Sequence, residues 1–237
     1  MMKNLFCILA LGAALWGCSE SVKPLVLVEN AAVSKDSANV TVDINYPLVT
    51  DSRYAPLREA INGRVAQIVW DQTPRPYDPQ NDDLRSITYE PDMDRPVSSQ
   101  MCWTMCSGEK LVSVELGGYW FAGGAHGMSF HWVEHFDPTT GAKIQIRDYI
   151  TDSVAFLDVV REELAADSIV LYPWVTDLML PNNFLVDSIS ITAIYNQYDI
   201  APYAAGILDI PIRFSQISGA VDTLSLAPSS IRTIHGK

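Results

Sequence analysis

Apolar and polar residues alternate along four segments of the chain, which is the pattern of strands that bury one face. These segments are NVTVDINYP at 39–47, KLVSVEL at 110–116, SISITAIY at 188–195 and ILDIPIRF at 207–214. Pro211 lies inside the last one. Because proline cannot donate a backbone hydrogen bond, we predict an edge position for that strand.

Two other segments repeat their apolar residues at three- and four-residue steps, as an amphipathic helix does. The first is APLREAINGRVAQIVW at 55–70, with Pro56 in the first turn, where its missing N–H is harmless. Its apolar stripe consists of Leu57, Ile61, Val65, Ile68 and Val69. A second helix is expected after a cap at Asp152 or Ser153. Its predicted buried residues are Leu157, Val160 and Leu164.

The connections between these segments indicate an α+β fold. Residues 73–96 are rich in Pro, Asp and Asn, which is typical of an irregular excursion. The sequence DPTTG at 137–141 predicts a turn that joins a strand ending at Phe136 to KIQI at 143–146. Strands and helices follow without regular alternation, and the turns suit antiparallel pairs. We therefore predict one or more antiparallel sheets with two main helices packed on one side.

The composition is that of a globular protein with a strongly acidic balance. The chain has 237 residues, of which 48% are hydrophobic and 19% charged, and its net charge is −12. A nucleic-acid partner is not expected, because phosphate binding needs a basic face. An acidic surface favours solubility, or a basic protein partner attracted by electrostatic steering.

The first seventeen residues, MMKNLFCILALGAALWG, have the features of a secretory signal peptide. Lys3 precedes an unbroken run of twelve apolar or small residues, fewer than the roughly 20 that span a bilayer. The run ends in LWGC, which resembles the lipobox of bacterial lipoproteins, although Trp16 stands where a small residue is usual. The resemblance implies a signal peptide at 1–17, a lipid on the Cys18 thiol, and a lipidated tether at 18–24.

Cys102 and Cys106 remain once Cys7 leaves with the signal peptide and Cys18 is lipidated. Outside the cytoplasm, two nearby thiols usually oxidise to a disulfide. Their spacing in MCWTMCSGEK suits a bridge across the end of a hairpin, where two strands come within bonding reach. Such a short loop would shape the turn more than it would stabilise the domain.

Three of the four histidines lie in YWFAGGAHGMSFHWVEHF, residues 119–136. If residues 129–136 form a strand, Glu134 lies on an aromatic face, where it needs a partner or an open edge. His131 and His135 then share the opposite face. They would lie about 13 Å apart along the strand, which makes them a poor pair of metal ligands. We predict no metal site and no cofactor.

Three glycines surround Ala125 and His126 in GGAHG, at 123–127, which marks a sharp turn or a close backbone approach. Two roles fit His126: a general acid or base, or a structural histidine bonded to backbone carbonyls of the turn. No nucleophile or acid stands beside it in a recognised catalytic arrangement. We therefore predict no catalytic residue.

The segment YNQYDIAPYAAG, at 195–206, places three tyrosines and an acid between two strands. Tyrosine rings make good ligand-facing surfaces, and they also pack around loops without any ligand, so both interpretations stay open. The ligand-binding candidates of the chain are Tyr119, His126, Glu134, Tyr195, Tyr198, Asp199 and Tyr203.

Three ordered motifs, Y.FAGGAHG, FDPTTGAKIQIRDY and YDIAPYAAG.LDIPIRF, resemble the extracytoplasmic region shared by the lysozyme-sensing anti-sigma factor RsiV and the peptidoglycan deacetylase PdaC. The motifs cover residues 119–214, and the match over 25–100 is looser. The resemblance implies a PdaC-like N-terminal domain at 25–136. It also implies an RsiV-like C-terminal domain at 137–237, packed with the first as one unit.

The resemblance and the acidic balance favour a binding or sensing lipoprotein over an enzyme. It would sit in the cell envelope, periplasmic or surface-exposed, anchored to the membrane by its lipid. The expected ligand is a lysozyme-like protein or a cell-wall component such as a peptidoglycan fragment. The alternatives are a glycan or peptidoglycan hydrolase that uses His126 and Glu134, and a structural envelope protein without a small-molecule site. A groove that joins GGAHG to the tyrosine loop would favour binding.

Overall fold

The computed structural model describes residues 26–37, 39–80, 87–90, 94–108, 110–221 and 232–235. The expected signal peptide at 1–17 and the tether at 18–24, with Cys18, lie outside the described residues. None of the helices in the described part combines the length and hydropathy that a membrane span requires.

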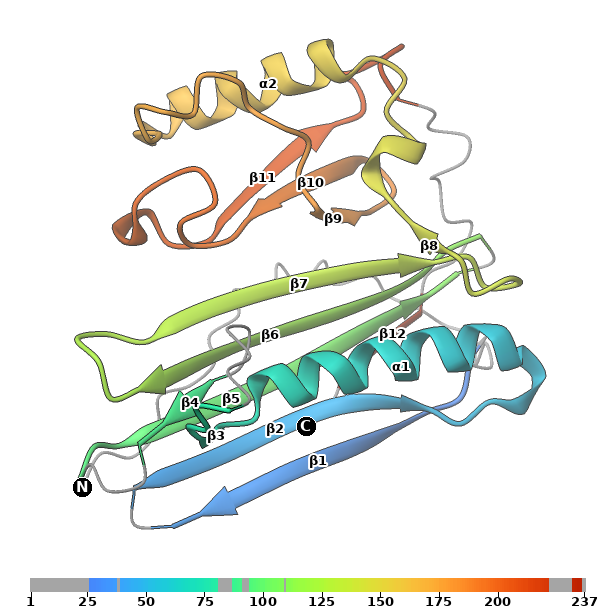
Figure 1. Ribbon diagram of the computed structural model, residues 1–237. Coiled ribbons are helices and arrows are strands. Elements are labelled where there is room, and N and C mark those ends of the chain that lie inside the picture. Colours follow the sequence, from blue (N-terminus) through green and yellow to red (C-terminus); the bar gives the residue numbers. More distant parts are fainter. Residues whose placement is uncertain are drawn as a thin grey trace.

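A large, mostly antiparallel sheet forms the lower half of the molecule in Figure 1. Its strands, in spatial order, are β1 (Val28–Asp36), β2 (Val40–Val49), β5 (Val97–Ser107), β6 (Val112–Ala122), β7 (Met128–Phe136) and β8 (Lys143–Ile144). A further strand, β12 (Arg232–His235), pairs with β5 where β2 no longer reaches it. The pairing of β2 with β5 is parallel, and the other pairs of this sheet are antiparallel.

Helix α1 (Ala55–Gln72) follows the short helix η1 (Ser52–Tyr54) and supplies the crossover that the parallel pair β2–β5 needs. Its five predicted apolar residues are all buried against the large sheet, and Pro56 lies in its first turn, as expected. The segment 73–96 is not wholly irregular, because β3 (Arg75–Pro76) and β4 (Thr88–Tyr89) pair in parallel within it.

A smaller sheet lies above the large one and is covered on its outer side by α2 (Ser153–Ala166) (Figure 1). Its strand order is β11 (Leu208–Arg213), β10 (Ser190–Tyr195), β9 (Asn183–Val186), all antiparallel. The short helices η2 (Ile146–Asp148) and η3 (Tyr203–Ala205) complete this half. The Asp152 side chain accepts hydrogen bonds from two backbone N–H groups and caps α2, as predicted. Pro211 lies on β11, an edge strand, which confirms that expectation.

The two sheets have separate hydrophobic cores. The first is built from residues between 26 and 136 and includes the buried face of α1, and the second from residues between 146 and 221 with that of α2. The fold is thus α+β with antiparallel-dominated sheets and two main helices, as predicted, and each helix covers one side of its own sheet. The division into domains at 136/137 stays a prediction.

The cysteine pair contradicts the expected hairpin bridge. Strand β5 runs without interruption through both Cys102 and Cys106, and its hairpin with β6 turns only at 108–111. Four residues along one strand correspond to about 13 Å, well beyond the Cα separation that a disulfide tolerates. The Cys102 thiol instead lies 3.5 Å from the carbonyl oxygen of Gly117 on β6.

Candidate functional site

The outer edge of β7 is covered by side-chain amides of the smaller half. Strand β8 pairs with β7 only at its last two residues, so the preceding edge lacks a neighbouring strand. The N–H groups at alternate positions along this edge donate to amide oxygens, with N···O distances of 2.7 to 3.4 Å. The pairs are Ser129 with Gln197, His131 with Asn196, and Val133 with Asn183. The Asn196 amide also donates to the His131 carbonyl, over 2.9 Å, and so pairs with this residue as a strand would.

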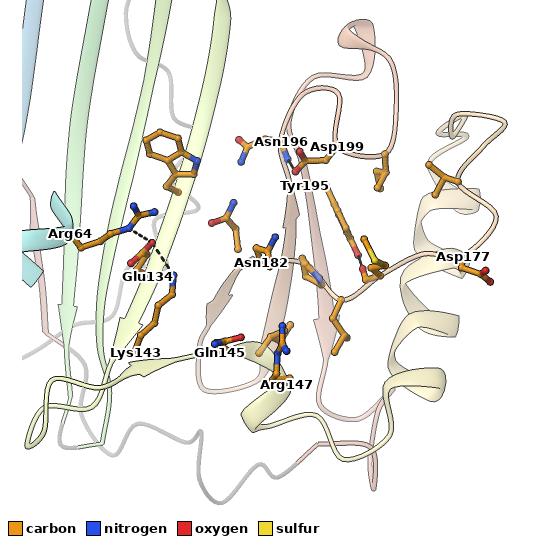
Figure 2. Close-up of a pocket in the computed structure, with 18 of the residues that line it drawn as sticks. Arg64, Glu134, Lys143, Gln145, Arg147, Asp177, Asn182, Tyr195, Asn196 and Asp199 are labelled. Atoms are coloured by element: carbon orange, nitrogen blue, oxygen red, sulfur yellow. Dashed lines mark hydrogen bonds and ion pairs between the residues drawn. The ribbon is translucent and has the colours of Figure 1, made fainter. Parts of the chain in front are cut away.

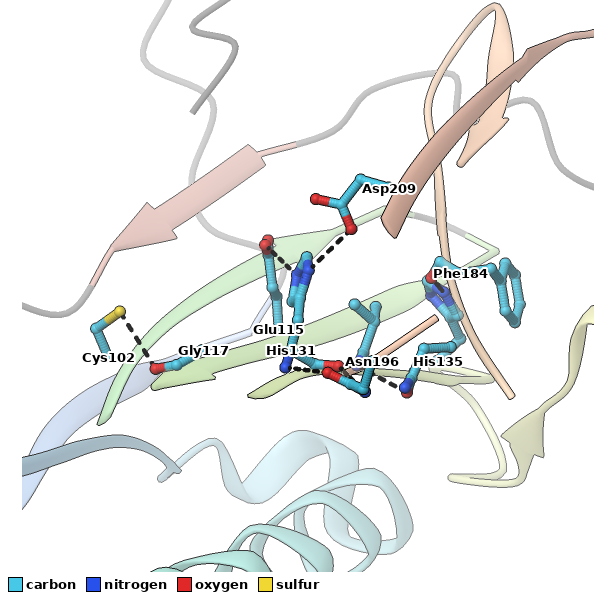
Figure 3. Close-up of polar contacts among 10 residues, drawn as sticks. Cys102, Glu115, Gly117, His131, His135, Phe184, Asn196 and Asp209 are labelled. Carbon is cyan, nitrogen blue, oxygen red and sulfur yellow. Dashed lines mark hydrogen bonds and ion pairs between the residues drawn. The ribbon is translucent and has the colours of Figure 1, made fainter. Parts of the chain in front are cut away.

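His131 joins the two sheets through two carboxylates (Figure 3). Its Nε2 lies 2.8 Å from Glu115 Oε1 on β6, and its Nδ1 lies 3.4 Å from Asp209 Oδ1 on β11. Burial opposes protonation of the ring, but the hydrogen bonds to Asp209 and Glu115 outweigh it and raise the pKa of His131 to about 9. The charged imidazolium therefore links the large sheet to the smaller one through its contacts with Glu115 and Asp209.

His135 lies on the same face of β7 but is neutral. Its Nε2 is 2.7 Å from the carbonyl oxygen of Phe184, so this nitrogen carries the hydrogen, and its Nδ1 accepts from the Ser113 hydroxyl over 2.7 Å. Complete burial lowers the pKa of His135 to about 4. Both histidines are thus committed to protein partners. Across the described residues, no group of His, Cys, Asp and Glu is arranged to hold a metal ion.

A groove of about 990 Å³ opens between the two halves (Figure 2). Residues of α1, β7 and β8 form one wall, and the segments 174–183 and 195–200 of the smaller half form the other. Residues 145–147, at η2, line the groove between these walls. Three of the predicted ligand-binding residues, Glu134, Tyr195 and Asp199, line it. The other four lie outside its lining.

Glu134 is buried in the first wall, with a side chain that is 9% exposed, and it has two cationic partners. Its Oε1 accepts from Arg64 Nε over 2.6 Å and from Lys143 Nζ over 3.0 Å (Figure 2). Glu134 therefore has the charged partners that its position on the aromatic face of β7 requires. The Glu134 carboxylate joins α1, β7 and β8 through its ion pairs with Arg64 and Lys143.

The opposite wall carries aromatic and acidic groups. Trp174 is 72% exposed and stacks on Tyr172 with ring centroids 4.4 Å apart. The buried Tyr195 hydroxyl donates to the Met179 carbonyl, so Tyr195 contributes its ring rather than a free hydroxyl. Burial raises the pKa of Asp199, although a hydrogen bond from the Asn196 N–H opposes this shift.

GGAHG meets only Tyr198 and Tyr203 of the tyrosine segment, at the other end of β7 and outside the groove lining. The His126 ring stacks on Tyr203 with centroids 4.0 Å apart, and Tyr198 lies 5.9 Å from Tyr203. Tyr198 has a φ of +71° and is 44% exposed. We call His126, Tyr198 and Tyr203 the aromatic cluster. A Cβ at Gly127 would overlap the Tyr119 hydroxyl, so the glycine allows that side chain to pack under the turn.

His126 and Glu134 do not form a pair. His126 precedes β7, and Glu134 lies near the far end of that strand, about 20 Å further along at 3.3 Å per residue. General acid–base catalysis by the two together would need both at one substrate bond. His126 and Glu134 therefore do not face one bond in this structure, and the hydrolase alternative stays a prediction.

Several important residues of the site were missed from the sequence. The amides that cover β7 and the carboxylate of Asp209 lie 50 to 78 positions from their partners along the chain. The one available signal is the pair of amides in YNQY, next to the predicted tyrosine candidates. The residues around Trp174, in the segment YPW, show no periodic pattern, so the sequence does not indicate whether this ring lines a groove or lies in an exposed loop.

Comparison with known proteins finds a similarity over part of the chain. Residues 136–215 match DUF3298, described as a protein of unknown function. A DUF3298 family member of known structure from Bacteroides fragilis NCTC 9343 is 16% identical, with a TM-score of 0.48 over 84% of this chain and 95% of that chain. Another, from Pseudomonas aeruginosa PAO1, is 16% identical, with a TM-score of 0.49 over 89% and 99% of the two chains. Among curated proteins, none matches the chain.

Proposed function

We propose that this chain is a lipid-anchored binding protein of the bacterial cell envelope, and that its ligand, a cell-wall fragment, binds in the groove between the two halves. The observation that carries the proposal is the groove itself. Its volume of about 990 Å³ is at the upper end of the range for small-molecule sites. The exposed Trp174 ring offers an apolar face, and Asn182 and Gln145 offer amides for ligand hydroxyls or peptide groups.

The ion pairing of the Glu134 carboxylate favours binding over hydrolysis in the groove. Hydrolysis of a glycan needs one protonated and one charged carboxyl flanking the same bond. Glu134 is neutralised by Arg64 and Lys143, and it faces the groove only slightly. Oε1 of Glu134 is already occupied by both cations, so this carboxylate holds Arg64 and Lys143 in place beside the groove.

Binding is tested by titrating soluble cell-wall fragments into the purified protein and following tryptophan fluorescence and heat. We expect saturable binding that Trp174→Ala weakens about tenfold, the size of a lost stacking contact. Trp70→Ala is the matched control, because Trp70 is 58% exposed and lies outside the groove lining. Binding that survives Trp174→Ala, or an equal loss with Trp70→Ala, contradicts the groove as the site.

The lipid anchor rests on LWGC and the apolar run before it. Two or more acyl chains hold a protein stably on a membrane, at about 0.8 kcal/mol per buried methylene. Mass spectrometry of the mature protein from a bacterial host should show an N-terminal, acylated Cys18. The Cys18→Ala variant should leave the membrane fraction. An uncut leader with an unmodified thiol at Cys18 would remove this part of the proposal.

A lysozyme-like protein is the second candidate ligand, supported by the RsiV-type and PdaC-type resemblance and by the aromatic cluster. Exposed tyrosine rings are frequent anchors of protein interfaces, and a net charge of −12 attracts a basic partner. Immobilised protein should retain lysozyme at low salt and, more weakly, at moderate salt. Tyr198→Ala should reduce retention at both. No retention at either salt concentration excludes this candidate.

A further inference from the structure

The groove carries a positive wall within an acidic protein. Arg64 and Lys143 share a single carboxylate, Glu134, so this trio keeps a net positive charge. Arg147, on η2, also lines the groove, and within the described residues it has no ion pair and no side-chain hydrogen bond. All three cationic side chains project toward the groove in Figure 2. Guanidinium and ammonium groups so placed form charge-assisted hydrogen bonds to a ligand carboxylate.

The opposite wall is acidic. Asp199 uses Oδ2 for the Asn196 N–H, and Asp177 makes no ion pair or side-chain hydrogen bond to another described residue. Both residues line the groove, but only Asp199 lies on the side that faces Arg64 and Lys143, whereas the Asp177 side chain points away from them (Figure 2). Burial raises the pKa of Asp199, which means that a cation beside it would restore the charge that burial disfavours.

We infer that the groove selects a zwitterionic ligand, a short peptide or a peptide-bearing glycan fragment. Its carboxylate meets Arg64, Lys143 and Arg147, and its amine meets Asp199. This inference rests on the proposed function and narrows it from a cell-wall fragment to the part of such a fragment that carries both charges. A neutral glycan leaves both charged walls without partners, whereas a zwitterion satisfies both at once.

Alanine oligomers of two to five residues are a direct probe, because their ends carry one charge of each sign and their length varies. Isothermal titration compares the free peptide with its N-acetyl, C-amide and doubly blocked forms. We expect the free peptide of best length to bind tightest. Blocking either end should weaken binding about tenfold, as expected for one charge-assisted contact in a partly exposed site. Raised salt should weaken the free peptide most.

Single variants assign each end of the ligand to its wall. Arg147→Gln should weaken the free peptide about tenfold yet leave its C-amide form unchanged. Asp199→Asn should weaken the free peptide and leave its N-acetyl form unchanged. The matched controls are Arg213→Gln and Asp158→Asn, which remove the same charges outside the groove lining and should change nothing.

The outcomes separate this inference from the proposed function. Equal affinity of free and doubly blocked peptides overturns the zwitterion and leaves a binding groove. Binding of neutral glycan fragments without any peptide binding also overturns it and leaves the proposed function standing. Failure of both peptides and cell-wall fragments to bind, with unchanged tryptophan fluorescence, removes the two together.

Discussion

At the scale of residues, His131 and His135 show how surroundings override identity. They lie four positions apart on the same face of β7, and their pKa values move in opposite directions. His131 has two carboxylates as partners, whereas His135 has a hydroxyl and a carbonyl oxygen in a fully buried site. One imidazole is therefore a cation and the other a neutral hydrogen-bonding side chain.

The raised pKa of His131 predicts a loss of stability in alkali. Because the folded pKa is about 9 and the unfolded value about 6.5, the stabilisation is complete below pH 6.5 and disappears as the pH rises to 9. The expected loss is on the order of 3 kcal/mol. Urea unfolding at pH 6.5 and 9.5 measures it. His131→Gln should show a much smaller change in the free energy of unfolding over the same interval. If this variant keeps the pH dependence of the wild type, the ion pairs of His131 with Glu115 and Asp209 are not its source.

His135 gives the opposite prediction. Its folded pKa of about 4 lies below the unfolded value of about 6.5, so its contribution is present above pH 6.5 and is lost as the pH falls toward 4. Nitrogen-detected NMR of the imidazole ring should show a neutral ring with the hydrogen on Nε2 down to about pH 5. A His135 signal that titrates near pH 6.5 would show that the ring is not buried between Ser113 and Phe184.

At the scale of elements, the amide side chains of the smaller half replace a missing neighbour of β7. Removing the Asn196 side chain leaves the N–H and C=O of His131 without partners. Each unsatisfied buried group costs about 1–3 kcal/mol. Asn196→Ala should therefore lower the free energy of unfolding by at least 2 kcal/mol. Asn182→Ala, an exposed amide nearby, is the control and should change it by less than about 0.5 kcal/mol.

Two glycines within regular elements should respond oppositely to alanine. A Cβ at Gly118 on β6 would overlap the Gln100 carbonyl oxygen and the Phe130 ring, so Gly118→Ala should cost about 3 kcal/mol. Gly63 lies inside α1 with no atom near its added Cβ, so Gly63→Ala should stabilise by about 0.5–1 kcal/mol. Thermal unfolding of the two variants checks both signs, and a destabilised Gly63→Ala would mean that α1 packs differently.

Local patterns were enough for most elements and failed where distant segments meet. The stripe from Leu57 to Val69 and the alternation at 207–214 are properties of a few adjacent residues, and the structure confirms both. The cysteine bridge failed because alternation continues through Cys102 and Cys106, so the hairpin end was placed too early. The hydrogen bond between Asn196 and His131 joins residues 65 positions apart, and the ion pair of Arg64 with Glu134 at the groove joins residues 70 positions apart. No local pattern encodes contacts over such separations.

At the scale of the whole molecule, two separate cores are joined by polar contacts along β7. The amides and the His131–Asp209 contact link the large sheet to the smaller half, and the groove lies along this junction. Polar junctions of this kind hold two halves in register without merging their cores. The position of the groove walls therefore depends on the same few side chains.

Cooperativity of unfolding should depend on these contacts. The wild-type protein should unfold in one transition, because the halves stabilise one another. The double variant Asn196→Ala with Asp209→Asn should unfold in two, with the strands β9, β10 and β11 exchanging their amide hydrogens first. Calorimetry and hydrogen exchange measure both effects. Two transitions in the wild type, or one in the double variant, would show that the halves are coupled in another way.

The covered edge of β7 has a consequence for how the protein survives at high concentration. An open strand edge is a template on which a second molecule can add its own strand, and repeated addition builds fibrils. At the other margin of the sheet, β1 carries Glu29, Lys35 and Asp36, charges that discourage such growth. At β7 the protection comes from Asn183, Asn196 and Gln197, which occupy three backbone N–H groups of this edge and the carbonyl of His131. The same three amides that align the halves thus also guard against self-assembly.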